Sequence, residues 1–293
     1  MNLQFTEVSF RGFRGTAIIT GANGGIGQQL TETLANEGYT IIMACKNKAE
    51  SECICSRIKE KTNCNSIEVM ELDLASFASI GQFVKDFHSK YGKLDVLLNN
   101  AGVLCHHPHQ TKENAEYTVG VNYLGSYVLT GLLHPMMNKE TKIINTVSLM
   151  LRFGKINPDF FQLDASHFNR FTQYSNSKLA LYYATLDWAE KWEKENITVN
   201  CVDPGIVSTN IIRMGNKFID KLCDIFYRPL IRTPKQGADT IIYLLNNKEM
   251  ESISGQVFKS RRIKTIPSEL RDNQQRELLR TQTQEFLKQH PLS

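Results

Sequence analysis

The chain has 293 residues, 41% hydrophobic and 22% charged, so it is too apolar to be disordered and long enough to bury a large core unaided. Its formal charge of +4 is small, and the basic residues are scattered apart from a modest group at 213–232, so we expect no nucleic-acid partner. The seven cysteines lack paired or zinc-ligand spacing, which favours a reducing compartment and predicts a cytoplasmic location.

Apolar runs typical of strands alternate with helical patterns along the chain. The first strand, 17–20, leads to a helix with Ile26, Leu30 and Leu34 on one face and Gly38 at its C-terminal cap. Further strands are expected at 39–44, 67–72, 94–98, 142–147, 197–202 and 255–259, and further helices at 48–61, 76–91, 113–136, 172–194, 237–245 and, as a polar surface tail, 267–293. This alternation predicts an α/β fold of the Rossmann type, a doubly wound parallel sheet with helices on both faces, in one domain spanning 1–293.

Nothing in the sequence predicts a membrane span or a secretory signal. No run of about 18 apolar residues occurs, and the first 14 residues lack an apolar core followed by a cleavage site. The histidines of Cys105-His106-His107-Pro108-His109 match no ligand spacing that we can defend, so we predict no metal site.

A glycine-rich segment joins the first strand to the first helix. It reads Thr20-Gly21-Ala22-Asn23-Gly24-Gly25-Ile26-Gly27. Glycines let the backbone approach a pyrophosphate closely, and the helix N-terminus offers N–H groups and a favourable dipole. We predict dinucleotide binding by Gly21, Asn23, Gly25, Ile26 and Gly27, the alternative being a turn that serves only the fold.

The end of the second strand bears on cofactor choice. An acidic residue here would bind the 2′-hydroxyl of the adenosine ribose and repel a 2′-phosphate, yet the sequence reads Ala44-Cys45-Lys46-Asn47-Lys48. Lys46 could neutralise that phosphate, which predicts NADP(H) in preference to NAD(H). The alternative is that Lys46 is merely a solvated lysine.

Tyr174 and Lys178 lie four residues apart on the expected helix 172–194, so they share one face. A phenol normally ionises near pH 10, and a nearby ammonium together with a cationic nicotinamide would favour the phenolate. We predict that Tyr174 is the acid/base of a hydride transfer and that Lys178 lowers its pKa. Ser148 follows the strand 142–147, at the edge where such sheets bind ligands, and could hydrogen-bond the substrate oxygen.

The ordered set of motifs resembles the short-chain dehydrogenase/reductase superfamily over about residues 15–260. The matching motifs are Thr20-Gly21-x-x-x-Gly25-Ile26-Gly27, Asn99-Asn100-Ala101-Gly102, Tyr174-x-x-x-Lys178 and Pro204-Gly205. Finer likeness is to the retinol-dehydrogenase-like branch, through Leu72–Ser76, Asn145–Ser148, Ser177–Ala180, Thr233–Ala238 and the long gap between Ser148 and Tyr174. The chain departs from that branch at Lys46, where arginine is usual, at Asp203, where histidine often stands, and in an expected lack of an N-terminal membrane anchor.

The resemblance implies further roles. Asn122 would hold a water leading to Lys178, and Lys178 would also hold the nicotinamide ribose. Cofactor contacts are implied for Asp73, Leu74, Asn99, Ala101, Gly102, Pro204, Gly205, Val207 and Thr209. A homodimer or homotetramer is implied through the helices at 113–136 and 172–194, with Trp188 and Trp192 in that contact or in the core.

Residues 209–232 are expected to form a lid over the site. Ile211, Met214, Phe218, Leu222, Ile225 and Phe226 recur at helical spacing. A hydrophobic substrate lid is the favoured interpretation, with core packing and membrane-surface contact as alternatives. Ser148, Leu149, Tyr174 and Met214 are the predicted substrate contacts, and Met150, Leu151, Phe153, Phe160 and Phe161 could line the same pocket.

An apolar pocket predicts a lipophilic alcohol, aldehyde or ketone as substrate. The predicted function is therefore NADP(H)-dependent hydride transfer on such a compound by Tyr174, Lys178, Ser148 and Asn122. One alternative is a non-catalytic NADP(H)-binding regulatory protein of the same fold, and another is a retinoid enzyme at a membrane surface.

Overall fold

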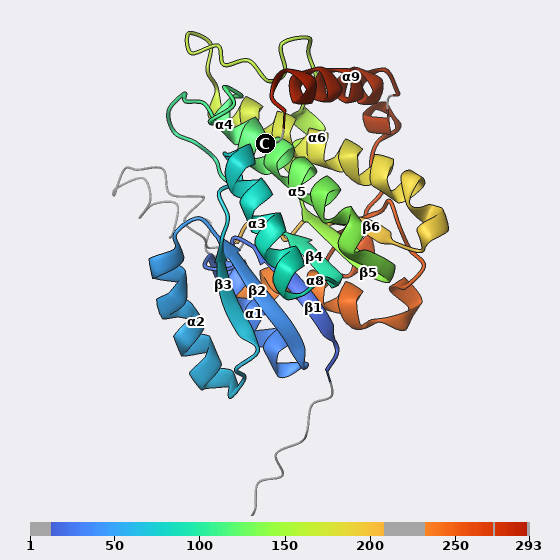
Figure 1. Cartoon of the computed structure of the whole chain (residues 1–293). Coiled ribbons are helices and arrows are strands. Elements are labelled where there is room, and N and C mark those ends of the chain that lie inside the picture. Colours follow the sequence, from blue (N-terminus) through green and yellow to red (C-terminus); the bar gives the residue numbers. More distant parts are fainter. Residues whose placement is uncertain (1–12, 208–231, 272, 292–293) are drawn as a thin grey trace, which may run out of the picture.

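The computed structural model describes residues 13–207, 232–271 and 273–291 (Figure 1). Within them, eight strands form one sheet in the order β3-β2-β1-β4-β5-β6-β7-β8. Their bounds are β1 Gly15–Thr20, β2 Tyr39–Cys45, β3 Ile67–Glu71, β4 Leu94–Asn99, β5 Met137–Thr146, β6 Thr198–Val202, β7 Val257–Lys259 and β8 Arg262–Ile263. The first seven pair in parallel, and β8 returns antiparallel to β7. The predicted Rossmann-type doubly wound sheet is confirmed.

Helices connect the strands and cover both faces of the sheet. Their bounds are α1 Gly25–Asn36, α2 Lys48–Thr62, α3 Phe77–Lys90, α4 Tyr117–Val119, the π-helix η1 Gly120–Gly125, α5 Ser126–Leu133, η2 His134–Met136, η3 Leu149–Phe153, α6 Arg170–Lys191, η4 Glu193–Glu195, α8 Pro234–Asn246, η6 Lys248–Met250, η7 Ser268–Arg271 and α9 Asn273–Gln289. Successive strand residues point to opposite faces, so Ile18 packs in one core and Ile19 in the other.

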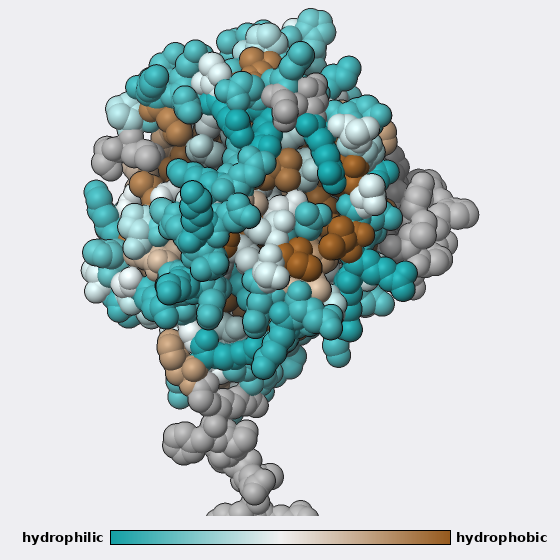
Figure 2. All heavy atoms as spheres, turned by 90° about the vertical axis from the view of Figure 1, so that its right-hand side faces the viewer, coloured by the Kyte–Doolittle hydropathy of each residue, from teal (hydrophilic) through white to brown (hydrophobic). Residues whose placement is uncertain are grey.

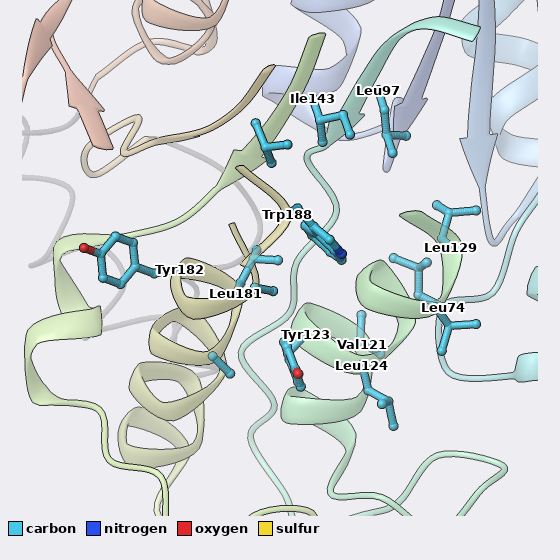
Figure 3. Close-up of a cluster of buried hydrophobic side chains, with 14 of the residues drawn as sticks. Leu74, Leu97, Val121, Tyr123, Leu124, Leu129, Ile143, Leu181, Tyr182 and Trp188 are labelled. Carbon is cyan, nitrogen blue, oxygen red and sulfur yellow. The ribbon is translucent and has the colours of Figure 1, made fainter. Parts of the chain in front are cut away.

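The two cores differ in which helices close them. One lies under α1, α2 and α8, and its members include Leu30, Ile54 and Ile241. The larger one lies under α3, α5 and α6, and Figure 3 shows part of it, with Leu129 and Leu181 among its side chains. A sheet buried on both faces leaves its strand ends as the place for a ligand.

The helix expected at 113–136 differs from the structure in two ways. It begins only at Tyr117, because Gln110 and Glu116 form a β-bridge and the Glu116 side chain caps the helix by accepting from the Val119 N–H. Between Gly120 and Gly125 it widens into a π-helix, a rare form that is frequent at functional sites. The short strand β8 is an element that the sequence pattern did not predict.

The C-terminal tail is helical as predicted, but α9 is docked rather than free on the surface (Figure 1). Arg276, Leu279 and Thr283 are buried. The Arg276 guanidinium pairs with Asp187 and Glu190 of α6. The last helix therefore covers part of α6, one of the two helices through which we expected copies of the chain to meet. Trp188 and Trp192 stack on each other inside the core, so the structure places both in the core.

Among the described residues, no helix is both long and apolar enough to cross a membrane. The six cysteines of this part of the chain are all free thiols. The face of the molecule in Figure 2 is largely hydrophilic, with small groups of hydrophobic side chains between polar ones.

Candidate active site

A cleft of about 1080 Å³ lies at the carboxyl ends of the strands. The chain winds outward from β1 to β3 and then returns to β4 on the other side of β1, so the cleft sits at the point where strand order reverses. Doubly wound sheets bind their ligands at this switch point. The described segments that line the cleft are 20–28, 44–57, 72–74, 100–104, 146–150, 170–178 and 204–207, each in part, together with Tyr117 and Val121.

The glycine-rich loop has the shape that a dinucleotide phosphate requires. Gly21 has φ +62, and a Cβ on Gly27 would lie 2.4 Å from the Gly21 carbonyl oxygen, so neither position accepts a side chain. The N-cap of α1 is Gly24, which offers no side-chain acceptor, and the first turn holds no acid. The first-turn N–H groups thus face the cleft without a competing anion, which fits a pyrophosphate.

The loop after β4 forms the opposite wall and is fixed by Thr20. The Thr20 hydroxyl oxygen accepts from the N–H groups of Asn100, at 3.0 Å, and Ala101, at 2.9 Å. The Asn100 amide also donates to the Thr20 carbonyl at 2.9 Å. Ala101 and Gly102, for which we predicted cofactor contacts, line the cleft. Thr20 and Asn100 are positioning residues that sequence reasoning did not assign, although both lie inside the quoted motifs.

The resemblance implied a cofactor contact for Asn99, but the structure places the Asn99 side chain elsewhere. It is the last residue of β4 and its side chain turns into the sheet interior, where it donates to Asn145 at 2.8 Å and Thr130 at 3.0 Å. It does not line the cleft, whereas its neighbour Asn100 does. The side chain of Asn99 therefore stabilises the strands from within.

At the adenosine end, Lys46 lies beside Asp73 and Tyr117. Its ammonium is 3.0 Å from Asp73 Oδ2 and donates to the Tyr117 hydroxyl at 3.2 Å. Partial burial alone would lower the pKa of Lys46, but the hydrogen bonds to Asp73 and Tyr117 raise it overall, so the group is a cation. Asp73 and Leu74, for which we predicted cofactor contacts, line the cleft, and so does Tyr117, which the sequence analysis did not single out.

Tyr174 and Lys178 lie on one face of α6, and both line the cleft. Lys178 is buried, and its Nζ donates to the Thr146 carbonyl at 2.8 Å and lies 5.6 Å from the centre of the Tyr174 ring. Burial lowers the pKa of Lys178 to about 8, so most of it is charged at neutral pH.

The phenol of Tyr174 is less acidic than we expected from its neighbour Lys178. Burial, followed by the carboxylate of Asp203, raises the pKa of Tyr174 to about 12, against a smaller lowering by the Ser148 hydroxyl. In the structure the Lys178 ammonium donates to the Thr146 carbonyl, so Lys178 makes no direct hydrogen bond that would lower the pKa of the phenol. The phenol is therefore protonated over the neutral range and is poised to donate a proton.

Ser148 and Asn122 support this pair in different ways. Ser148 follows β5 and lines the cleft, and its Oγ accepts from the Met150 N–H at 3.3 Å. Asn122 is fully buried in the π-helix, where its Oδ1 accepts from Val103 N–H at 2.7 Å and its Nδ2 donates to Val103 O and Ser177 Oγ. Asn122 thus holds the loop that carries Gly102 in place. Gly102 is close to Lys178, since a Cβ on Gly102 would lie 3.4 Å from Lys178 Nζ.

The segment after β6 lines the part of the cleft where the family resemblance implies the nicotinamide, here called the nicotinamide end. Pro204, Gly205 and Val207, for which we predicted cofactor contacts, line the cleft. Thr209, Met214 and the rest of the expected lid before Arg232 lie outside the described residues. Asp203 accepts from the Gly205 N–H at 3.0 Å, which fixes this turn.

The hydrophobic residues after Ser148 divide among several environments. Met150 lines the cleft, but the predicted substrate contact Leu149 does not. Leu151, Phe160 and Phe161 are buried in the core, and Phe153 is 73% exposed. For residues 149–153 the reason is the 3-10 turn η3, which directs consecutive side chains to different sides.

The histidine loop holds no metal-binding cluster in the part of the chain that the structure describes. Instead, His106 accepts from the Arg170 guanidinium at 2.9 Å, and the His109 ring packs at a tilt against the Tyr117 ring.

A switch-point cleft with a glycine cradle and a Tyr–Lys pair defines a dinucleotide-binding oxidoreductase. Comparison with known proteins identifies the family more narrowly. A family profile for short chain dehydrogenases matches residues 15–218 of this chain. The chain is 33% identical to human (Homo sapiens) retinol dehydrogenase 14 over 260 residues, which cover 83% of this chain and 77% of the relative. It is 34% identical to human polyprenol dehydrogenase over 254 residues, covering 82% and 74%.

Among solved structures, an uncharacterised protein from Mycobacterium Paratuberculosis shares the fold with a TM-score of 0.73 at 22% identity, covering 94% of each chain. The chain belongs to the short-chain dehydrogenase/reductase family, as a retinol-dehydrogenase-like member and an oxidoreductase that acts on CH–OH groups.

Proposed function

We propose that the protein is an NADP(H)-dependent oxidoreductase that interconverts a lipophilic alcohol with its aldehyde or ketone. The proposal rests mainly on one observation. Tyr174, Lys178 and Ser148 line the same cleft as Lys46. Fold alone would not establish activity, but a complete proton-transfer set beside a phosphate cradle supports it.

The chain's own residues can perform the proton transfer. When bound, the reduced nicotinamide supplies a hydride to the carbonyl carbon of the substrate. Tyr174 then donates its phenolic proton to the developing alkoxide, and Ser148 stabilises that oxygen by a hydrogen bond. The Lys178 ammonium compensates the charge left on the phenolate. Because the phenol of Tyr174 is protonated in the neutral range, the site suits reduction of a carbonyl.

Two observations favour a lipophilic substrate. The lining of the cleft includes the apolar side chains of Val103, Leu104, Met150, Phe171 and Ile206. Two relatives of the chain are a retinol dehydrogenase and a polyprenol dehydrogenase, and both are named for lipophilic alcohols. The proposal takes 1–293 as one catalytic domain in the cytoplasm, acting as a homo-oligomer.

The alternative function is a regulatory protein that binds NADP(H) without turnover. The complete set Asn122, Ser148, Tyr174 and Lys178 favours the enzyme, since a regulator has no need of it.

The proposal is tested by following NADPH and NADH oxidation in parallel against retinal, steroid ketones and medium-chain aldehydes. We expect turnover with NADPH that disappears in Tyr174→Phe, while NADPH binding, measured by fluorescence titration, is kept. Turnover that survives in Tyr174→Phe would exclude this mechanism, and tight NADPH binding without any turnover would favour the regulatory protein.

A further inference from the structure

Tyr117 is held rigidly at the adenosine end of the cleft. It begins α4, and its backbone N–H donates to the His109 carbonyl at 3.0 Å. The His109 ring packs against the Tyr117 ring, with the centroids 4.0 Å apart and the planes tilted by 30°. A phenol fixed at both its backbone and its ring loses little further entropy when it binds a ligand.

Lys46 and Tyr117 are joined by a hydrogen bond whose direction is fixed by chemistry. An ammonium can only donate, so Lys46 Nζ donates to the Tyr117 oxygen at 3.2 Å. The proton of the Tyr117 hydroxyl is then left for another acceptor. The ammonium has three N–H groups, of which one faces Asp73 and one Tyr117, so its third is left as well.

The two remaining donors lie side by side on the cleft wall. Phosphate recognition in proteins often uses the paired donors of one arginine, whereas a lysine acts as a single point charge. Here, Asp73 offsets part of the Lys46 charge from 3.0 Å, which weakens Lys46 as a lone phosphate ligand. A second donor on the Tyr117 oxygen, 3.2 Å from the ammonium, restores a pair of donors.

We propose that Tyr117 is a specificity-determining residue that binds the 2′-phosphate of the adenosine ribose together with Lys46. The third N–H of Lys46 and the O–H of Tyr117 donate to two oxygens of the phosphate monoester. The inference rests on the proposed use of NADP(H) and adds a residue to it, 71 positions away from Lys46 in the sequence.

The test is calorimetric titration with adenosine 2′,5′-bisphosphate and with AMP, which probes the adenosine end without any turnover. For Tyr117→Phe we expect about ten-fold weaker binding of the bisphosphate, the loss of one hydrogen bond to a charged group, and an AMP affinity within about two-fold of the original. The NADPH-to-NADH affinity ratio of the full protein should fall by the same factor.

A rescue and a matched control sharpen the result. Lys46→Arg placed in Tyr117→Phe should restore most of the bisphosphate affinity, because one guanidinium then supplies both donors. Tyr243→Phe is the control: its ring also faces a cation, with Arg261 at 5.7 Å, but it does not line the cleft. It should leave both affinities unchanged.

The outcomes separate this inference from the proposed function. If Lys46→Ala weakens the bisphosphate and AMP equally, the preference for NADP(H) fails and the inference fails with it. If Lys46→Ala is selective but Tyr117→Phe is not, the cofactor preference stands and the role of Tyr117 is overturned. Equal loss of both ligands in Tyr117→Phe would also overturn it, since Tyr117 would then only shape the adenine pocket.

Discussion

Asp203 and Lys259 form an ion pair of 2.8 Å at the nicotinamide end of the cleft, with the Asp203 side chain only 4% exposed. The same carboxylate raises the pKa of Tyr174 and accepts from the Gly205 N–H. Asp203 stands where the related branch often has histidine, so the residue before Pro204 brings a negative charge close to the proton donor. The ion pair with Lys259 keeps that charge in place despite its burial.

The first prediction concerns the pH dependence of the reaction. Asp203→Asn removes a negative charge, so the pKa of Tyr174 should fall. Oxidation needs the phenolate, so the increase of its rate with rising pH should begin at a lower pH than in the original protein. Reduction needs the phenol, so the decrease of its rate with rising pH should also begin at a lower pH. The measurement is kcat/KM against pH in both directions.

Asp239→Asn is the control for this change, because Asp239 also pairs with a cation, Arg261, but lies outside the cleft. An identical pH profile in Asp203→Asn and the original protein would contradict an electrostatic role for Asp203.

The second prediction concerns Asn122 in the π-helix. Asn122→Ala leaves the Val103 N–H and carbonyl without their partners, so it should cost about 2–3 kcal/mol of unfolding free energy. Val103 directly follows Ala101 and Gly102 in the cleft wall, so the folded variant should in addition bind NADPH about ten-fold more weakly, or weaker still. Urea denaturation and fluorescence titration measure the two effects.

Asn200 provides the comparison, since it is also buried and bridges backbone groups, of Ile253 and Gln256, away from the cleft. Asn200→Ala should lower stability similarly and leave NADPH binding intact. Equal cofactor affinity in the two variants would assign Asn122 a purely structural role.

Sequence reasoning predicted the fold well because the signal is local. Each buried strand is a short apolar run, and each helix carries one apolar face, so the order of elements follows directly. The pair Tyr174 and Lys178 was also accessible, since a helix brings residues four apart onto one face. Strand β8 has only two residues, both exposed, and such a strand has no hydrophobic pattern to detect.

The site features that the sequence analysis missed depend on tertiary contacts, or on the opposite directions in which the side chains of two neighbouring residues point. Tyr117 meets Lys46 only because β2 ends and α4 begins at the same edge of the sheet. Asn99 and Asn100 are adjacent, but β4 extends to Asn99, so the side chain of Asn99 enters the core and that of Asn100 reaches the cleft. The pKa of Tyr174 depends on Asp203, 29 residues further along, and on the direction of the Lys178 side chain.

The third prediction concerns the phosphate cradle. Gly27→Ala places a Cβ 2.4 Å from the Gly21 carbonyl oxygen and 2.6 Å from the Ala22 Cα, so the loop must move. We expect a loss of about 1–3 kcal/mol in stability and at least about ten-fold weaker binding of NADPH and NADH alike. Gly131→Ala in α5 meets no atom within 4 Å and should be neutral or stabilising by up to about 1 kcal/mol. Unchanged cofactor affinity in Gly27→Ala would refute the cradle.

The fourth prediction concerns the docking of α9 on α6. Arg276 is 10% exposed and donates to both oxygens of Glu190, at 2.9 and 2.6 Å, as well as to Asp187. Arg276→Ala should cost about 2 kcal/mol, less than for a fully buried pair, because Glu190 is 64% exposed and Asp187 keeps Arg280. Arg280→Ala, at a more exposed position, should cost about 1 kcal/mol or less.

The pH dependence of the Arg276 contribution follows from Glu190. Arg276 holds the pKa of Glu190 below its ordinary value, so the contribution is complete above the unfolded-state pKa and is lost as the pH falls through the folded-state pKa. The difference in unfolding free energy between the original protein and Arg276→Ala should therefore shrink in acid. Urea denaturation at neutral and acidic pH measures it. A difference that stays constant between the two would show that Arg276 stabilises α9 through packing of its aliphatic stem rather than through its charge.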